Sequence, residues 1–160
     1  MVETGTTASA DNPGVIAWPP LLHAAALVVA LVLHWVWPWP VFDQPAYRWT
    51  GAVLVPVGIG IIIWGRITML AAGTNINPSR PAVALVTSGP FRFSRNPLYT
   101  ALMLIFIGLT LAFNTWWGFA LLIPVIVVMY VGVIRREERY LEQKFGESYR
   151  QYCSHVRRYF

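Results

Sequence analysis

No acidic residue occurs between Asp43 and Glu137, and most of that interval is apolar. Only 12% of the residues in the chain are charged and 56% are apolar, whereas a soluble domain has roughly 25% charged residues. So few charges cannot cover the surface of a globule in water. The composition therefore predicts a membrane protein with one compact domain, and it excludes intrinsic disorder, a coiled coil and a disulfide scaffold.

Four apolar segments are candidates for membrane helices: about 18–37, 49–72, 98–113 and 116–134. A helix that rises about 1.5 Å per residue needs roughly 20 residues to cross a hydrocarbon core of about 30 Å. The first, second and fourth segments meet this length, and the third is a little short. Because only a few residues join the third segment to the fourth, these two must form an antiparallel hairpin. The sequence thus predicts an all-α bundle of about four transmembrane helices.

Aromatic and basic residues predict the orientation of this bundle. Most arginines fall on one side of the membrane, in the loop 73–96 and in the tail after residue 134. The positive-inside rule therefore predicts that this loop, the tail and both termini are cytoplasmic. This topology accounts for the net charge of +5, so no nucleic-acid partner is expected. Six tryptophans lie on the other side by topology, as in an aromatic belt: Trp35, Trp37, Trp39, Trp49, Trp116 and Trp117.

Other features of the sequence bear on the organisation of the chain. Residues 1–16 are small and polar and indicate a flexible leader, which leaves 17–160 as a single domain. The single cysteine, Cys153, excludes an internal disulfide, and the three histidines are placed too far apart for a metal site. Arg66, near the inner end of the second segment, either extends its charge to the membrane surface or faces the bundle. Both interpretations of Arg66 stay open at this point.

Two polar stretches face the same predicted side of the membrane. The loop 73–96 has apolar residues between turn-forming prolines and glycines, which favours an ordered segment. The tail 135–160 predicts an amphipathic helix that is interrupted near Gly146. Glu137 and Glu138 stand at the start of this tail, directly after the fourth apolar segment. Because acids are so rare in this chain, the two glutamates are either a simple charge pair or a site for a cation.

Two motifs in these stretches resemble those of a known family. The sequence GPFR at 89–92, followed by SRNPLY at 94–99, is similar to the GPYxxxRHPxY motif of isoprenylcysteine carboxyl methyltransferases and their bacterial relatives. Their superfamily includes phospholipid N-methyltransferases, and the resemblance covers about residues 66–156. Tail residues that resemble the family signature EExxLxxxFGxxYxxY are Glu137, Glu138, Leu141, Phe145, Gly146, Tyr149 and Tyr152.

The chain departs from the family pattern at three positions. Asn96 takes the place of the family histidine, Ala101 that of a frequent glycine, and Arg157 that of a usual proline. Asparagine cannot titrate near pH 7 as histidine does, but it still donates and accepts hydrogen bonds. The substitution at Asn96 is therefore expected to change how cofactor or substrate is oriented.

The resemblance implies an integral membrane enzyme that binds S-adenosylmethionine on its cytoplasmic side without a Rossmann domain. It implies that Glu137 or Glu138 holds the ammonium group of the cofactor, and that Arg95 pairs with a carboxylate of cofactor or substrate. Further residues are implied to surround the cofactor. The residues that would shape the pocket are Asn96, Pro97 and Tyr99. The residues that would hold the adenosine are Val86, Thr87, Gly89, Pro90 and Phe91.

Methyl transfer from a sulfonium requires alignment of the reacting atoms more than acid catalysis, which suits a chain with few acids and bases. A lipophilic acceptor would arrive from the bilayer, and its nucleophile is left open between oxygen, nitrogen and sulfur. Arg95 or Arg66 would steer a carboxylate acceptor, and Glu138 would take the proton from an amine. Two alternatives are an NADPH-dependent membrane reductase-like protein and a catalytically inactive membrane partner of the same fold.

Overall fold

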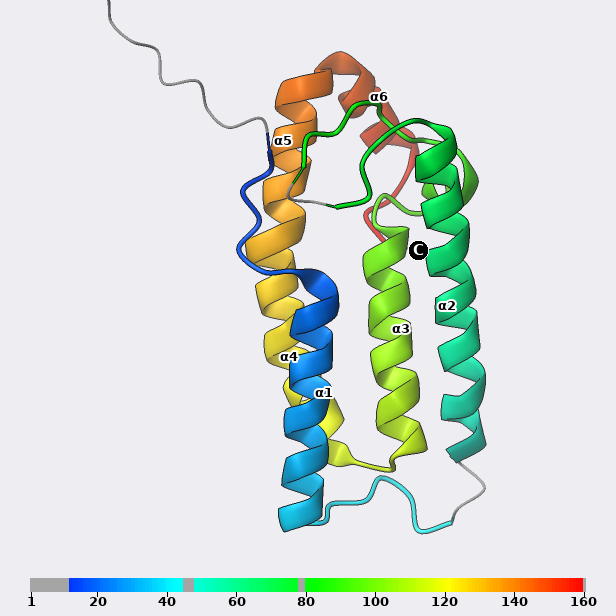
Figure 1. Ribbon diagram of the computed structural model, residues 1–160, viewed down its shortest axis with the longest axis vertical. Coiled ribbons are helices and arrows are strands. Elements are labelled where there is room, and N and C mark those ends of the chain that lie inside the picture. Colours follow the sequence, from blue (N-terminus) through cyan, green and yellow to red (C-terminus); the bar gives the residue numbers. More distant parts are fainter. Residues whose placement is uncertain (1–11, 45–47, 78–79, 160) are drawn as a thin grey trace, which may run out of the picture.

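The computed structural model describes residues 12–44, 48–77 and 80–159. Four apolar helices lie side by side and make an elongated bundle (Figure 1). The described residues contain no β-strand, so the predicted all-α class is confirmed. The four helices are α1 (Pro19–Val36), α2 (Arg48–Ala71), α3 (Pro97–Ala112) and α4 (Trp116–Met129).

Three helices within the described residues are long and apolar enough to cross a membrane: α1, α2 and the continuous helix Trp116–Phe145 that begins with α4. Their number and composition indicate a membrane protein. The fourth, α3, has 16 residues, fewer than the roughly 20 required for a full crossing. It packs against α1, α2 and α4, and a short turn joins it to α4 as the predicted antiparallel hairpin (Figure 1).

Glycines form the contact between α2 and α3. The buried residues of α2 are Gly51, Gly58 and Gly65, which recur every seven residues and so lie on one face of the helix. A Cβ at Gly51 would collide with the Gly108 carbonyl, and a Cβ at Gly65 would lie 2.6 Å from the Leu98 side chain. Small residues allow apolar helices to approach closely. This spacing is visible in the sequence, although the sequence analysis did not use it.

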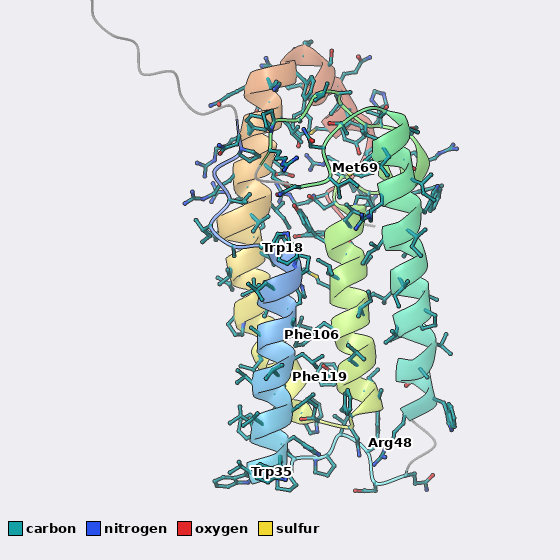
Figure 2. All side chains as sticks on the ribbon, viewed as in Figure 1. Trp18, Trp35, Arg48, Met69, Phe106 and Phe119 are labelled. Atoms are coloured by element: carbon teal, nitrogen blue, oxygen red, sulfur yellow. The ribbon has the colours of Figure 1, made fainter. Side chains whose placement is uncertain are left out.

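The end of the bundle drawn at the bottom of Figure 2 is aromatic. The C-terminal end of α1 and the N-terminal ends of α2 and α4 meet there, and they carry the tryptophans of the predicted belt. The Trp39 ring contacts those of Trp116 and Trp117, with centroid distances of 6.1 and 5.4 Å. The Trp117 indole also donates to the Trp37 carbonyl at 2.9 Å. The polar loop and tail lie at the opposite end (Figure 1).

Asn114, in the turn between α3 and α4, holds the loop that follows α1. Its backbone has a φ of 55°, and the residue is 7% exposed. The Oδ1 atom accepts from the Val41 and Phe42 amides at 3.0 and 2.8 Å, and Nδ2 donates to the Phe42 carbonyl at 2.8 Å. One side chain therefore connects both turns at this end of the bundle.

Asn114→Ala is expected to lower the free energy of unfolding by about 3 kcal/mol. The substitution leaves the Val41 and Phe42 amides and the Phe42 carbonyl without their hydrogen-bond partner, and it places alanine at a positive φ. Asn114→Gly removes the same hydrogen bonds but tolerates this backbone, so it should cost about 1 kcal/mol less. Thermal unfolding in detergent measures both variants. Gln44→Ala is the control, because Gln44 is exposed in the same loop. Equal stability of Asn114→Ala and the parent protein would contradict the role of Asn114 in holding the loop.

The helix that begins with α4 continues beyond the apolar region. It passes through a π turn (Tyr130–Ile134) into α5 (Arg135–Phe145). Gly146 ends α5 with a φ of 53° and turns the chain into α6 (Glu147–His155). The predicted interruption of the tail helix is thus confirmed.

Residues 1–11 of the predicted leader lie outside the described residues. The following residues contact the bundle near the π turn. The Ile16 amide donates to the Gly132 carbonyl at 3.2 Å, and the Arg136 guanidinium donates to the Gly14 carbonyl at 2.8 Å. This part of the segment assigned to the leader therefore packs against the helix that carries the tail.

Candidate functional site

The two motif stretches meet at the polar end of the bundle. Arg95 precedes Pro97, the first residue of α3, and Tyr99 lies in the first turn of that helix. The Tyr99 hydroxyl donates to Oε1 of Glu137 at 2.8 Å, and Nη1 of Arg95 lies 3.4 Å from Oε1 of Glu138. Residues about 40 positions apart in the chain are thereby joined across the start of α3 and the start of α5.

The π turn precedes both glutamates. Such turns insert one extra residue into a helix and are frequent at functional sites. The extra residue rotates α5 relative to a regular continuation of α4, and both Glu137 and Glu138 line the same cavity. The sequence analysis did not predict this turn, because the apolar run Tyr130–Ile134 is compatible with an ordinary helix.

Helix α6 closes the site from the side of the tail. The Tyr152 hydroxyl donates to the Phe91 carbonyl at 2.6 Å, and Nη1 of Arg95 contacts the Cys153 sulfur at 2.8 Å. Burial raises the pKa of Tyr152 to about 12, and it also raises the pKa of Tyr149, to which the nearby Cys153 contributes. Both tyrosines therefore stay neutral hydrogen-bonding groups at physiological pH.

The C-terminal segment supplies a residue that the sequence analysis missed. Arg158 donates from Nε and Nη2 to the two carboxylate oxygens of Glu138, each at 2.8 Å. This bidentate contact raises the pKa of Arg158 above the ordinary value of an arginine. The Arg158 carbonyl accepts from Oγ of Ser94 at 3.1 Å and from Nδ2 of Asn96 at 3.2 Å. No motif includes Arg158, and its only signal in the sequence is a positive charge in the same tail as two rare acids.

Asn96, at the position of the family histidine, contacts the protein's own tail through its side chain. Its amide donates to the Arg158 carbonyl, and its backbone carbonyl accepts from Thr100 in the first turn of α3. The adjacent Arg95 amide also donates to the tail, to the Arg157 carbonyl at 2.9 Å. Asn96, which departs from the family pattern, thus binds the C-terminal segment to the loop 73–96, which we call the motif loop.

Side chains around the loop 73–96 hold it in place. Oγ1 of the buried Thr74 accepts from the Val83 amide at 3.0 Å. Nδ2 of Asn75 donates to the Pro81 carbonyl at 2.7 Å, and the Tyr140 hydroxyl of α5 accepts from the Ala82 amide at 3.1 Å. The described part of the loop is thus ordered by α5 and by its own side chains.

A cavity lies between this loop, the start of α3 and helices α5 and α6. About 890 Å³ of empty space lies within it, including space that is open to solvent. Thr74 and Tyr140 line it as well, although the sequence analysis did not select them. Predicted site residues on its wall are Val86, Phe91, Arg95, Asn96, Pro97, Tyr99, Glu137 and Glu138.

Three predicted residues do not line this cavity: Thr87, Gly89 and Pro90. Gly89 begins the 3₁₀ turn η2 (Gly89–Arg92) with a φ of 58°. A Cβ at Gly89 would collide with Thr68 of α2. Gly89 and Pro90 thus place the turn against α2, next to Phe91, and they do not themselves face the cavity.

Five acidic and basic residues line or adjoin the cavity: Arg80, Arg95, Glu137, Glu138 and Arg158. Glu138 is shared by Arg95 and Arg158, and its side chain is 16% exposed. Glu137 has Tyr99 as its one hydrogen-bond partner among the described residues and forms no ion pair with them. Nε of Arg95 is buried and has no hydrogen-bond partner within the described chain. Among the residues on this wall, Glu137 is thus a carboxyl group without an ion pair, and Arg95 keeps one N–H without a hydrogen-bond partner.

Metal-ligating side chains do not gather at this site. Across the described ranges, no group of three or more His, Cys, Asp or Glu residues is placed to hold a metal ion. His23, on α1, is buried, and its Nδ1 lies 2.7 Å from the Pro19 carbonyl.

The sequence pattern of the phospholipid methyltransferase family matches residues 46–148, which include the motif loop, α3 and the tandem glutamates. The chain belongs to this family. This is a family of membrane methyltransferases, and the matched residues include most of the site described above. No solved structure shows significant similarity to the chain.

Curated relatives of this chain come from several bacteria. The cobalt-zinc-cadmium resistance protein CzcN of Cupriavidus metallidurans is 31% identical over 62% of this chain and 48% of that protein. The nickel-cobalt-cadmium resistance protein NccN of Alcaligenes xylosoxydans is 30% identical over 62% of this chain and 46% of that protein. An uncharacterized protein of Haemophilus influenzae is 40% identical over 39% of this chain and 98% of that protein. The chain aligns with about half the length of the first two relatives.

Proposed function

We propose that this protein transfers a methyl group from S-adenosylmethionine to a lipophilic acceptor at the membrane surface. The observation that carries the proposal is the pair of available groups in one cavity, the unpartnered Nε of Arg95 and the carboxylate of Glu137. The amino-acid end of this cofactor has one carboxylate and one ammonium group. A guanidinium and a carboxylate on the same wall suit both ends of such a zwitterion.

The contacts support distinct roles for the two glutamates. Both oxygens of Glu138 already accept from Arg158, and one lies near Arg95. Glu138 is therefore better suited to position Arg95 than to take a proton, the role that the sequence analysis assigned to it. We assign the cofactor ammonium to Glu137 and the cofactor carboxylate to Arg95. Arg158 acts as a positioning residue, because it orients Glu138.

Apolar and aromatic side chains supply a wall for the adenosine. Val86 and Phe91 from the loop and Tyr152 from α6 line the same cavity as the charged groups. Such a mixture, mostly apolar with a few polar groups, is typical of cofactor sites. In the proposed site, Asn96 and Pro97 shape the cavity at the start of α3, whereas Thr87, Gly89 and Pro90 act only by holding the loop.

When bound, S-adenosylmethionine would supply an electrophilic methyl group on a sulfonium that is already a good leaving group. The protein has to align the acceptor with this methyl group and keep water out. Alignment alone contributes several kcal/mol, up to about 7–11 kcal/mol in favourable cases. Tyr99 lies on the cavity wall and is fixed by its hydrogen bond to Glu137. It is therefore suited to position the acceptor next to the cofactor, and it need not donate a proton.

The proposed site faces the cytoplasm. The loop and tail that form it carry most of the arginines of the chain, and the tryptophan-rich end of the bundle is opposite. The positive-inside rule favours this orientation. Cofactor from the cytoplasm and acceptor from the bilayer would then meet at the inner membrane surface.

Isothermal titration calorimetry of the purified protein with S-adenosylmethionine tests the first step. We expect saturable binding with about one cofactor per chain. Incubation of the protein with methyl-labelled cofactor and a bacterial lipid extract, resolved by mass, then identifies the acceptor. Absence of binding would contradict the proposal and favour an inactive membrane partner, whereas NADPH oxidation without methyl transfer would favour a reductase.

A further inference from the structure

Residues 12–16, which we call the N-terminal strap, lie beside the helix that carries the two glutamates of the site (Figure 1). Pro13 of the strap lines the cavity together with Glu137 and Glu138. Within the strap, the Gly14 amide donates to Oδ1 of Asn12 at 2.9 Å. The strap therefore contributes to the wall of the proposed cofactor site, although it comes from the other end of the chain.

Two hydrogen bonds join the strap to the π turn and to the start of α5. The Ile16 amide donates to the Gly132 carbonyl, inside the π turn, at 3.2 Å. The guanidinium of Arg136, the residue directly before Glu137, donates to the Gly14 carbonyl at 2.8 Å. Because π turns are rare within helices, contacts from outside the helix can decide whether such a turn persists.

The Ile16 side chain lies directly against Gly132. Gly132 is buried, and a Cβ at this position would collide with Cδ1 of Ile16 and lie 2.5 Å from its Cγ1. The same Cβ would lie 3.9 Å from the Cβ of Ile16, which is an ordinary contact. The absence of a side chain in the π turn thus lets the strap approach the helix.

An apolar cluster connects the strap with the site. Val15 packs against this cluster, and so does Tyr99, which donates its hydroxyl proton to Glu137. The buried members of the cluster are Val125, Met129 and Val133, of which Val133 belongs to the π turn. The strap, the π turn and the partner of Glu137 therefore share one packed group of side chains, in which movement of one member is felt by the others.

The π turn decides which face of α5 meets the cavity. Successive residues of an α-helix are rotated by about 100° around the helix axis. Loss of the extra residue of the π turn would rotate α5 by about this angle, and Glu137 would leave the wall that it shares with Tyr99. The contacts of the strap with Gly132 and Arg136 oppose such a rotation.

We infer that the N-terminal strap is a positioning element of the cofactor site, which holds the π turn in place and so keeps Glu137 directed toward the cavity. The inference rests on the proposed function and adds two positioning residues to it, Ile16 and Arg136. Neither of them lines the cavity. Ile16 acts through the π turn, and Arg136 acts through the Gly14 carbonyl of the strap.

A pair of substitutions tests the contact between the strap and the π turn. Gly132→Ala should weaken S-adenosylmethionine binding about 5- to 10-fold, as expected for the loss of one or two hydrogen bonds. Adding Ile16→Ala to this variant should restore binding, because it removes the two atoms that collide with the new Cβ and keeps the backbone amide. Calorimetry in detergent compares the variants. If Gly132→Ala binds as the parent protein does, or if Ile16→Ala does not restore binding, the inference is wrong.

Variants of Arg136 test the second contact without changing the π turn itself. Arg136→Gln should weaken cofactor binding about fivefold, and Arg136→Lys should retain most of it, because the ammonium group can still donate to the Gly14 carbonyl. Arg139→Gln is the matched control, since Arg139 is an exposed arginine of the same helix and does not line the cavity. Equal binding by Arg136→Gln and Arg139→Gln would overturn the inference.

Hydrogen exchange without cofactor separates this inference from the proposed function. In Gly132→Ala, amides of residues 130–141 should exchange about 5- to 10-fold faster, those of α3 should not change, and Ile16→Ala should reverse the effect. Faster exchange in α3 as well would indicate general destabilisation and overturn the inference. If exchange behaves as expected but the parent protein binds no S-adenosylmethionine, the proposed function fails while the hold of the strap on the π turn stands. If the parent protein binds the cofactor but exchange in residues 130–141 is unchanged, only the role of the strap fails.

Discussion

Glu138→Gln is expected to weaken S-adenosylmethionine binding by about 10- to 100-fold, or ~1.5–3 kcal/mol, and to lower the free energy of unfolding by about 3 kcal/mol. The parent carboxylate accepts two hydrogen bonds from Arg158 and lies 3.4 Å from Arg95. A neutral amide leaves these two arginines close together without a counter-charge. Arg95 then loses the orientation that we assign to it in cofactor binding.

Two further variants show whether the effect is specific. Glu137→Gln should weaken cofactor binding to a similar extent but leave stability nearly unchanged, because the glutamine oxygen still accepts from Tyr99. Glu142→Gln is the control, since Glu142 is exposed on the same helix and lies outside the cavity. Calorimetry and thermal unfolding in detergent measure the two quantities separately. Normal cofactor binding by both Glu137→Gln and Glu138→Gln would reject the site assignment.

Gly51→Leu is expected to lower the free energy of unfolding by about 3 kcal/mol or more, because it overpacks the contact between α2 and α3. A Cβ at this position would collide with the Gly108 carbonyl and lie 2.6 Å from the Ala112 nitrogen. Both are backbone atoms, which cannot move aside as a flexible side chain can. The two helices must separate to admit the new side chain.

Gly60→Leu on the same helix provides a matched control. No heavy atom lies within 4 Å of a Cβ at Gly60, so the added side chain faces open space. Leucine has a helix propensity about 0.8–1 kcal/mol better than glycine, and this variant should be as stable as the parent protein or more stable. Thermal unfolding in detergent compares the two variants. Equal melting temperatures for Gly51→Leu and Gly60→Leu would contradict the close contact between α2 and α3.

The tight contact between α2 and α3 also bears on the site. Gly65, the last of the three glycines, contacts Leu98 at the start of α3, and Thr68 of α2 contacts Gly89 of the motif loop. The inner end of α2 therefore sets the position of both the loop and the first turn of α3. For this reason small residues far from any charged group contribute to the placement of Arg95 and Tyr99.

The amino-acid sequence by itself determined the class of this protein, because the length and apolar character of a membrane helix are local properties. The hairpin of α3 and α4 and the interruption at Gly146 were likewise predictable, since a short connection and a glycine act over a few residues. The motifs at Arg95 and Glu137 indicated which stretches belong together, since they resemble a family pattern.

Only the tertiary structure decided how the charges are paired. The bidentate contact of Arg158 with Glu138 depends on the turn at Gly146, on α6 and on the tail that packs against Asn96. Such a contact depends on the positions of several segments at once, so no local pattern predicts it. The same holds for the cavity at the loop 73–96, whose wall combines that loop with α3, α5 and α6.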